Sequence, residues 1–325
     1  MTTLFNSSQW QQLIVDVYGY EPYRLPATMF GITPAFKVKS WVFGQKITNM
    51  PFNFYPALLT TETQEQNNLL EFFIDQCNAH KKIGVELKFS SPLSKDLLML
   101  KSWSVHQPFI RSTLSLKQDS ETTYRQASPN LRKNLNRIRN KVKRNQIELT
   151  LAQSPQEIQA FYDLLVQVYR DRHQMVCHPK KLYDQLFQRN LANFYLAKDQ
   201  QTVIAGVVIL LDQEKHYYAW GATHPHYLNI GVAMGLLDKA IQSAIDQGVT
   251  EFDFGTSPPS DHNLLEFKRR WGCDSIPTYY YKYPPKVQDD TPDLHTSYKT
   301  VRQLYKFVPT PVIKALLPII IPHFG

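Results

Sequence analysis

Residues 251–272, EFDFGTSPPSDHNLLEFKRRWG, contain the pattern that decides the fold of the second half of the chain. Phe252 and Phe254 alternate with Asp253, which is typical of a half-buried strand, and the glycine and prolines that follow end it. A helix begins next, because Asp261 suits an N-cap position. Apolar residues then recur at helical spacing: Leu264, Phe267 and Trp271. The stretch therefore predicts a strand, a turn and a short basic helix.

Lys268 is the residue of this helix that we connect with chemistry. It lies one turn from Leu264 and beside Phe267, at the edge of the apolar stripe. An ammonium group at such an edge is partly desolvated and can reach into a cleft, where it stabilises negative charge that develops during a reaction. A lysine at the border of a core has the same pattern, with its stem buried and its charge in water. Asp253 is placed to orient or deprotonate a reacting group, or to bond its own loop.

The stretch resembles the end of the acyltransferase domain in FemAB-like proteins and their BioF2-like relatives, which are tandem GNAT-type transferases that attach amino acids to peptidoglycan precursors. The similarity runs through FDFG and FKRRWG, and FKVKSWVFGQKITNMPFNFYPALLT at 36–60 is similar to the first domain of that family. The resemblance covers most of residues 25–285. It implies that Phe267 and Lys268 flank an acyl carbonyl and that Lys268 supports the tetrahedral oxyanion.

Composition is that of a large soluble protein. The chain has 325 residues, 43% of them hydrophobic, so it is long enough for one large core or two ordinary ones. Its three cysteines are far apart and odd in number, which argues against a disulfide framework and favours a reducing compartment. Its N-terminus lacks a signal-peptide pattern, and nowhere do about 18 apolar residues occur together. We expect a cytoplasmic protein with no transmembrane segment.

The positive charge of the chain is concentrated in one segment. Residues 111–145 hold ten Lys or Arg against two Asp or Glu, whereas the rest of the chain is nearly neutral. A helix begins in this segment at Ser128 and carries seven cations with no acid spaced to pair with them. Such a helix favours an anionic neighbour, and we predict that Arg132, Arg137 and Lys141 bind an anionic substrate. The alternative is a solvated face between two domains.

The order of predicted elements divides the chain into four parts. An α/β pattern precedes the basic segment, and the order strand, helix, three strands, helix, strand and helix follows it, as in a GNAT domain. We therefore predict an α/β (α+β) fold with two tandem GNAT-like domains, at 1–115 and 147–285. A basic connecting helix at 116–146 joins them, and a linker with an apolar and basic tail occupies 286–325.

A donor site is predicted where the helix at 231–247 begins. GNAT enzymes that use coenzyme A hold its pyrophosphate on backbone amides at a helix N-terminus. Gly231 and Ala233 stand where that motif needs small residues, but Leu228 occupies the position usually held by Arg or Gln. This departure leaves the donor open between acyl-CoA and aminoacyl-tRNA. We predict no metal cofactor, and we expect the acyl donor to be a cosubstrate.

The expected function is transfer of an acyl or aminoacyl group, from a thioester or an aminoacyl-tRNA, to an amine of a cell-envelope precursor or glycoconjugate. The tail at 298–325 mixes apolar and basic residues, so it docks either on the protein or peripherally on the inner membrane face, where a lipid-linked precursor would lie. Two alternatives stay open: an acyl-CoA-dependent N-acetyltransferase on a small amine, and a noncatalytic binder of nucleic acid or anionic lipid on a decayed GNAT scaffold.

Overall fold

The computed structural model describes residues 3–26, 34–41, 43–52, 62–80, 83–173, 177–285 and 307–325. The chain forms two compact units, each with its own sheet. The first unit consists of Met1–Ile110, Pro277–Val301 and Ala315–Gly325. The second unit consists of Arg111–Ile276 and Arg302–Lys314.

The first unit is built on a sheet with the strand order β1-β2-β3-β4-β13-β5. Its strands are β1 Glu21–Tyr23, β2 Ala35–Ser40, β3 Gly44–Thr48, β4 Ile83–Phe89, β5 Ser104–His106 and β13 Tyr279–Tyr283. All pairs are antiparallel except β3 and β4, which are parallel. A parallel pair needs a crossover connection, and the helix α2 lies between β3 and β4 in the chain.

The helices of the first unit are η1 Leu4–Asn6, α1 Ser8–Tyr18, α2 Thr63–Ala79, α3 Lys95–Leu100 and the 3₁₀ turn η5 Ile321–His323. Helix α1 starts where the Ser7 side chain accepts a hydrogen bond from the Trp10 N–H, and it ends at Gly19 in the left-handed conformation. The apolar face of α2 buries Leu69, Leu70 and Phe73 against β3, β4 and β13. This burial forms the core of the unit.

The second unit is built on a sheet with the order β12-β6-β11-β10-β9-β8-β7. Its strands are β6 Ile110–Ser115, β7 Ile147–Leu151, β8 Ala192–Asp199, β9 Thr202–Leu210, β10 Lys215–Thr223, β11 Glu251–Ser257 and β12 Asp274–Pro277. Strands β7 to β10 form an antiparallel meander, and β10 pairs with β11 in parallel. The α8 helix makes that parallel crossover.

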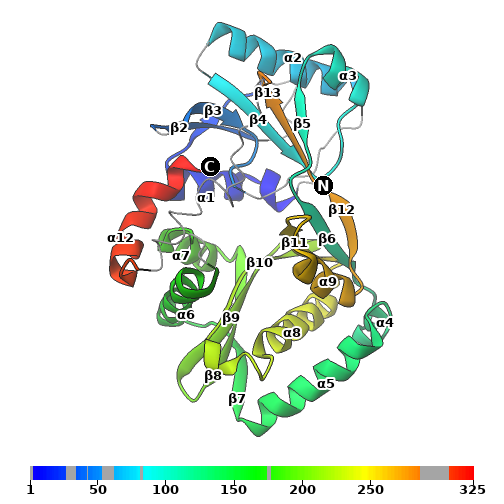
Figure 1. Ribbon diagram of the computed structural model, residues 1–325, viewed down its shortest axis with the longest axis vertical. Helices are drawn as coiled ribbons and strands as arrows, with labels where there is room; N and C mark the ends of the chain where they lie inside the picture. The colour runs from blue at the N-terminus through cyan, green and yellow to red at the C-terminus, as the bar shows by residue number, and fades with distance from the viewer. Residues whose placement is uncertain are drawn as a thin grey trace. The chain divides into compact units, whose positions relative to one another are not determined.

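Helices cover both faces of this second sheet (Figure 1). They are α4 Ser120–Tyr124, α5 Pro129–Arg144, α6 Pro155–Val168, the π-helical turn η3 Tyr169–His173, α7 Lys180–Gln188, the 3₁₀ turn η4 Pro225–Tyr227, α8 Val232–Asp246 and α9 His262–Arg270. The α6 and α7 helices pack on one face, whereas α5 and α8 share a core with the other face. A further helix, α12, spans Thr310–Ile320.

The predicted α/β class is confirmed, and so is the order of elements in the second unit, except that α7 is an additional helix between α6 and β8. The domain boundaries differ from those predicted. Strand β13, expected in the domain 147–285, belongs to the first unit because it pairs with β4 and β5. The helix expected to connect two domains is part of the second unit, because α5 buries its apolar stripe there. Most of the predicted linker, at 286–306, and the NFYPALLT part of the 36–60 stretch, at 53–60, lie outside the described residues.

Candidate active site

The predicted strand, turn and basic helix are present as β11 and α9, and local chemistry sets their bounds. Gly255 has φ +72°, a left-handed conformation that a residue with a Cβ rarely adopts. The Asp261 side chain accepts a hydrogen bond from the Leu264 N–H and so caps α9. Gly272 follows the helix with φ +86°. A Cβ at this glycine would lie 2.7 Å from the Gln126 backbone, so Gly272 also permits a close approach of two chain segments.

Lys268 is buried, with only 3% of its surface exposed. Its Nζ donates a hydrogen bond of 2.8 Å to the carbonyl oxygen of Gly255. The side chain therefore points inward from α9 toward the end of β11 and not into bulk solvent. Burial lowers the pKa of Lys268 to about 8, although the nearby Asp253 carboxylate favours the charged form. The group is thus mostly protonated at neutral pH and close to its titration range.

Asp253 lies on β11 with 2% of its surface exposed, and both of its oxygens are engaged. One oxygen accepts a hydrogen bond of 2.5 Å from Nε of Arg111 on β6. The same oxygen also forms an ion pair with Nη2 of that guanidinium. The other accepts the Gly255 N–H at 2.7 Å. The same glycine thus takes one contact from Asp253 and one from Lys268. The sequence interpretation missed Arg111, because nothing in its local sequence distinguishes it from other strand arginines.

Phe267 lies beside Lys268 on α9 and is partly buried in the core of the second unit. Its ring centroid is 6.4 Å from that of Phe254 and 6.3 Å from that of Trp271, both in edge-on geometry. Aromatic pairs with this geometry are favourable beyond the area they bury. The contacts fix α9 on β11 and so fix the position of the neighbouring lysine.

The lysine lies where two parallel strands cease to pair. The ladder joins Lys215–Tyr217 of β10 to Glu251–Asp253 of β11, and both strands continue beyond it. Gly255 lies just past the last pair with β10, and its carbonyl accepts the hydrogen bond from Lys268. Ligands of α/β sheets commonly bind beyond the carboxyl ends of strands, where backbone groups are free to make contacts. The end of β11 therefore combines a buried ammonium group with backbone groups at the edge of the sheet where ligands commonly bind.

The predicted donor residues lie at the start of α8. Gly231 is the N-cap residue and has φ +84°. A Cβ there would lie 2.9 Å from the Ile138 side chain of α5, so the glycine is required both by its conformation and by this close packing. Ala233 lies in the first turn of α8 and is only partly buried.

The basic helix α5 is not entirely without counter-charges. Arg139 forms a two-pronged contact with Asp238 of α8, at 2.9 Å and 3.0 Å, which corrects the expectation of seven unopposed cations. That acid lies on another helix, so spacing within α5 could not reveal it. Nζ of Lys141 donates a hydrogen bond of 2.8 Å to the carbonyl oxygen of Asn229, in the loop before α8. Arg132 and Arg137 are exposed on the surface of the helix.

In the described part of the chain, no three His, Cys, Asp or Glu side chains gather as metal ligands would. Among the helices of these same segments, none combines the length and the apolar character that a membrane span requires.

Comparison with known proteins agrees with this geometry. Residues 129–269 match the family model described as an acetyltransferase (GNAT) domain. This range begins at α5 and ends within α9, so it contains Asp253, Lys268 and the start of α8. No curated protein sequence is similar enough to match the chain.

Solved structures match over nearly the whole chain. FemX is similar with a TM-score of 0.64 and 13% identity, covering 92% of this chain and 94% of its own. The C-terminal domain of a putative lysylphosphatidylglycerol synthetase from Agrobacterium fabrum has a TM-score of 0.61 and 10% identity, covering 86% and 88%. L-PGS from Bacillus licheniformis has a TM-score of 0.56 and 11% identity, covering 93% and 98%.

The similarity to FemX confirms, at the level of the fold, the predicted resemblance to FemAB-like proteins with tandem GNAT-like domains. The family match confirms that the second unit carries an acyltransferase domain. Residues 129–269 match the model of the acetyltransferase (GNAT) domain family, and the chain has the fold of FemX.

Proposed function

We propose that this protein transfers an acyl or aminoacyl group to an amine of a cell-envelope precursor, with Lys268 at the reaction centre. One observation carries the proposal: a buried ammonium lies 2.8 Å from a backbone carbonyl at the end of β11, inside the matched GNAT domain. A buried cation at such an edge is costly unless it has a function or several partners. Charge stabilisation in acyl transfer supplies that function.

Lys268 acts on the carbonyl oxygen of the acyl group. When an amine attacks the activated ester or thioester, the carbonyl oxygen becomes negatively charged, and the ammonium offsets that charge in a low-dielectric setting. Its hydrogen bond to Gly255 uses one of three N–H donors, so donors remain for the oxyanion. Phe267 supplies an apolar neighbour that keeps water from the same region.

Asp253 positions the backbone of Gly255 and, through it, the Lys268 ammonium. Its carboxylate bonds the Gly255 N–H, and Arg111 holds the carboxylate from the neighbouring strand. The geometry favours orientation over deprotonation, because both oxygens already accept hydrogen bonds. The chain of contacts from Arg111 to Asp253, Gly255 and Lys268 fixes the ammonium without placing a second cation beside the acyl group.

The start of α8 binds the donor. Its first backbone N–H groups are positively polarised and favour phosphate groups, and Gly231 and Ala233 keep side-chain bulk low there. Acyl-CoA and aminoacyl-tRNA both bring phosphates to this point. A thermal-shift titration separates them: stabilisation by coenzyme A thioesters supports the first, whereas stabilisation by aminoacyl-tRNA alone supports the second. If neither ligand raises the melting temperature, the proposed donor site is wrong.

The acceptor is anionic and meets the exposed arginines of α5. Arg132 and Arg137 project into solvent, whereas Lys141 is committed to a loop carbonyl and stabilises the donor loop as much as it attracts an anion. The name of one structural neighbour, lysylphosphatidylglycerol synthetase, describes an aminoacylated lipid. A lipid-linked or phosphate-bearing precursor suits the charge of α5. Reversing the charge of both arginines should then raise KM and leave kcat nearly unchanged, whereas loss of kcat would place them in the chemistry.

Peripheral contact with a membrane surface fits this acceptor. In the first unit, Trp41 is 82% exposed and its indole N–H donates to His323, while Phe43 packs on Phe324. Ile319 on α12 is 62% exposed. Helix α12 buries Ile313 and Leu317, so part of the tail docks on the protein and its other apolar face stays uncovered. Aromatic and aliphatic side chains exposed together are typical of segments that lie in the lipid interface.

A further inference from the structure

Tyr124, on the short helix α4, is a buried residue that contacts both of the helices on which we place the chemistry. It is only 7% exposed, and its hydroxyl donates a hydrogen bond of 2.7 Å to Oδ1 of Asp238 on α8. Its ring lies edge-on to that of Trp271, the residue that directly follows α9, with 6.2 Å between the two ring centroids. One side chain therefore joins α8 to the end of α9, the helix that carries Lys268.

The carboxylate that accepts the Tyr124 hydroxyl is itself held in place. Asp238 is buried and also accepts the two-pronged contact from Arg139 of α5, together with a hydrogen bond of 2.9 Å from Gln242 one turn further along α8. Burial raises the pKa of Tyr124, and the negative charge of Asp238 raises it further. Because the phenol stays protonated, it remains a hydrogen-bond donor to this fixed carboxylate.

Trp271 depends on ring contacts for its position. It is fully buried, and its indole N–H has no hydrogen-bond partner within the part of the chain that the structure describes. Its ring centroid lies 5.6 Å from that of Phe254 on β11 and 6.3 Å from that of Phe267 on α9. Tyr124 is the aromatic neighbour whose hydroxyl is anchored on a different helix. Loss of that anchor would let the Trp271 ring shift toward Tyr124.

The backbone that follows α4 also holds the end of α9. The Ser128 N–H donates a hydrogen bond of 2.9 Å to the carbonyl oxygen of Arg270, the last residue of α9. Lys268 lies two residues earlier, in the same helical turn. The segment that begins at Tyr124 thus supports the turn from which the lysine side chain reaches the Gly255 carbonyl.

We propose that Tyr124 is a positioning residue for Lys268. Its hydroxyl, held by Asp238, keeps the Tyr124 ring against Trp271, and Trp271 keeps the last turn of α9 where the lysine ammonium reaches the Gly255 carbonyl. Without the hydroxyl, α9 loosens and water gains access to the ammonium. The consequence for acyl transfer rests on the function proposed above, whereas the placement of Lys268 does not.

Tyr124→Phe tests this role, because it removes the hydroxyl and keeps the ring. The first readout is the pKa of Lys268, followed by the carbon-13 resonance of its ε-carbon in the full chain and assigned by comparison with Lys268→Met. Burial lowers this pKa to about 8, and the ionisable groups that act on the ammonium, Asp253, Cys273 and Asp261, are left in place by the substitution. As the ammonium gains water, its pKa should rise by at least about 0.5, toward the ordinary value of 10.5.

The second readout is steady-state transfer from acetyl-CoA or from aminoacyl-tRNA, whichever raises the melting temperature of the wild type. Displacing a catalytic group by about 1 Å costs up to about 10² in rate, so kcat of Tyr124→Phe should fall about tenfold, with KM nearly unchanged. Arg139→Gln is the matched control, because it removes a partner of the same carboxylate and leaves the Tyr124 hydroxyl bonded to Asp238. It should lower the melting temperature but leave kcat and the Lys268 pKa near their wild-type values.

An unchanged Lys268 pKa in Tyr124→Phe would overturn the proposal. An equal rise in Arg139→Gln would do the same, because loss of stability alone would then explain the effect. A fall in kcat without a change in this pKa would also contradict it, since the hydroxyl would then affect the reaction by another route. Absence of transfer by the wild type would refute the proposed function, while the pKa comparison would still decide whether Tyr124 places the ammonium. Melting curves show that each variant is folded under the conditions of measurement.

Discussion

Replacing Lys268 by methionine should nearly abolish transfer while leaving the fold intact. Methionine keeps most of the buried aliphatic stem and removes only the ammonium. Loss of one oxyanion-stabilising group typically lowers kcat by about 10²–10³. We expect that loss in both kcat and kcat/KM, with KM little changed, because the interaction strengthens only in the transition state.

The effect of Lys268→Met on stability follows from two opposing terms. The fall in pKa from 10.5 to about 8 means that burial of the charged lysine costs about 3 kcal/mol at neutral pH. The substitution by methionine removes that cost. It also leaves the Gly255 carbonyl without its hydrogen bond, which lowers stability by about 1–3 kcal/mol. The two terms nearly cancel. The melting temperature should therefore change by only a few degrees.

The assay is steady-state transfer from the donor that the thermal-shift titration selects, with melting curves measured on the same preparations. Arg269→Met is the matched control, since Arg269 lies on the same helix, is exposed and pairs only with Glu266 among the contacts described. Activity of Lys268→Met within about threefold of the wild type would refute the assignment of Lys268. Such a result would favour the noncatalytic alternative, in which a GNAT scaffold only binds its ligand.

Three other predictions concern neighbouring features. The Lys268 ammonium loses its proton as the pH rises through about 8, so kcat measured at saturating amine should fall above that pH in the wild type. Asp253→Asn leaves the buried guanidinium of Arg111 without its counter-charge and should destabilise the fold by about 3–5 kcal/mol in denaturant unfolding, whereas an unchanged midpoint would show that the pair is dispensable. Trp41→Ala should reduce co-sedimentation with anionic phosphatidylglycerol vesicles, while Met99→Ala, which removes another exposed apolar side chain from the first unit, should not; equal losses would argue against a specific membrane contact.

Local pattern was enough to predict β11 and α9. The alternation around Asp253, the cap at Asp261 and the helical spacing through Trp271 are all properties of adjacent residues. The same holds for α5, whose start at Ser128 and whose run of cations were predicted from adjacent residues. Contacts between residues far apart in the chain were not predictable in this way. The partner of Asp253 is Arg111, 142 positions earlier, and it becomes a neighbour only because β6 and β11 are adjacent in the sheet.

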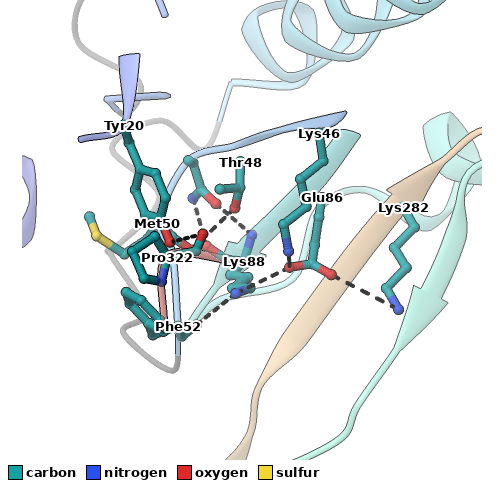
Figure 2. Close-up of polar contacts among 10 residues, drawn as sticks. Tyr20, Lys46, Thr48, Met50, Phe52, Glu86, Lys88, Lys282 and Pro322 are labelled. Carbon is teal, nitrogen blue, oxygen red and sulfur yellow. Dashed lines mark hydrogen bonds and ion pairs between the residues drawn. The ribbon is translucent and has the colours of Figure 1, made fainter. Parts of the chain in front are cut away.

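The first unit was harder to predict because its sheet is assembled from distant segments. Strand β13 lies between β4 and β5 in the sheet, although almost 200 residues separate it from β4 in sequence. Because β13 directly follows the second unit in the chain, the sequence placed it in the predicted domain 147–285. The ion pairs of Glu86 on β4 with Lys46 on β3 and Lys282 on β13 have the same origin (Figure 2). Lys46 and Lys282 come from opposite ends of the chain, and neither has a local motif that would join it to Glu86.

Gly231 illustrates how one residue type can satisfy two requirements. In the sequence it stands where a pyrophosphate loop needs a small residue. Its left-handed conformation already disfavours other residues, and an added Cβ would lie 2.9 Å from the Ile138 side chain. The glycine would thus be required in a protein that binds no phosphate at all.

Support for a donor at this point must therefore come from the backbone N–H groups that begin α8, whose polarity does not depend on side chains. Ligand-induced changes in the amide resonances of Val232 and Ala233 would report on those groups directly. Packing of Gly231 against α5 alone would leave these resonances unmoved when coenzyme A thioesters or aminoacyl-tRNA are added. Shifts confined to these amides at saturating ligand would locate the donor phosphates at the start of α8, whereas shifts elsewhere in the second unit would place the donor away from it.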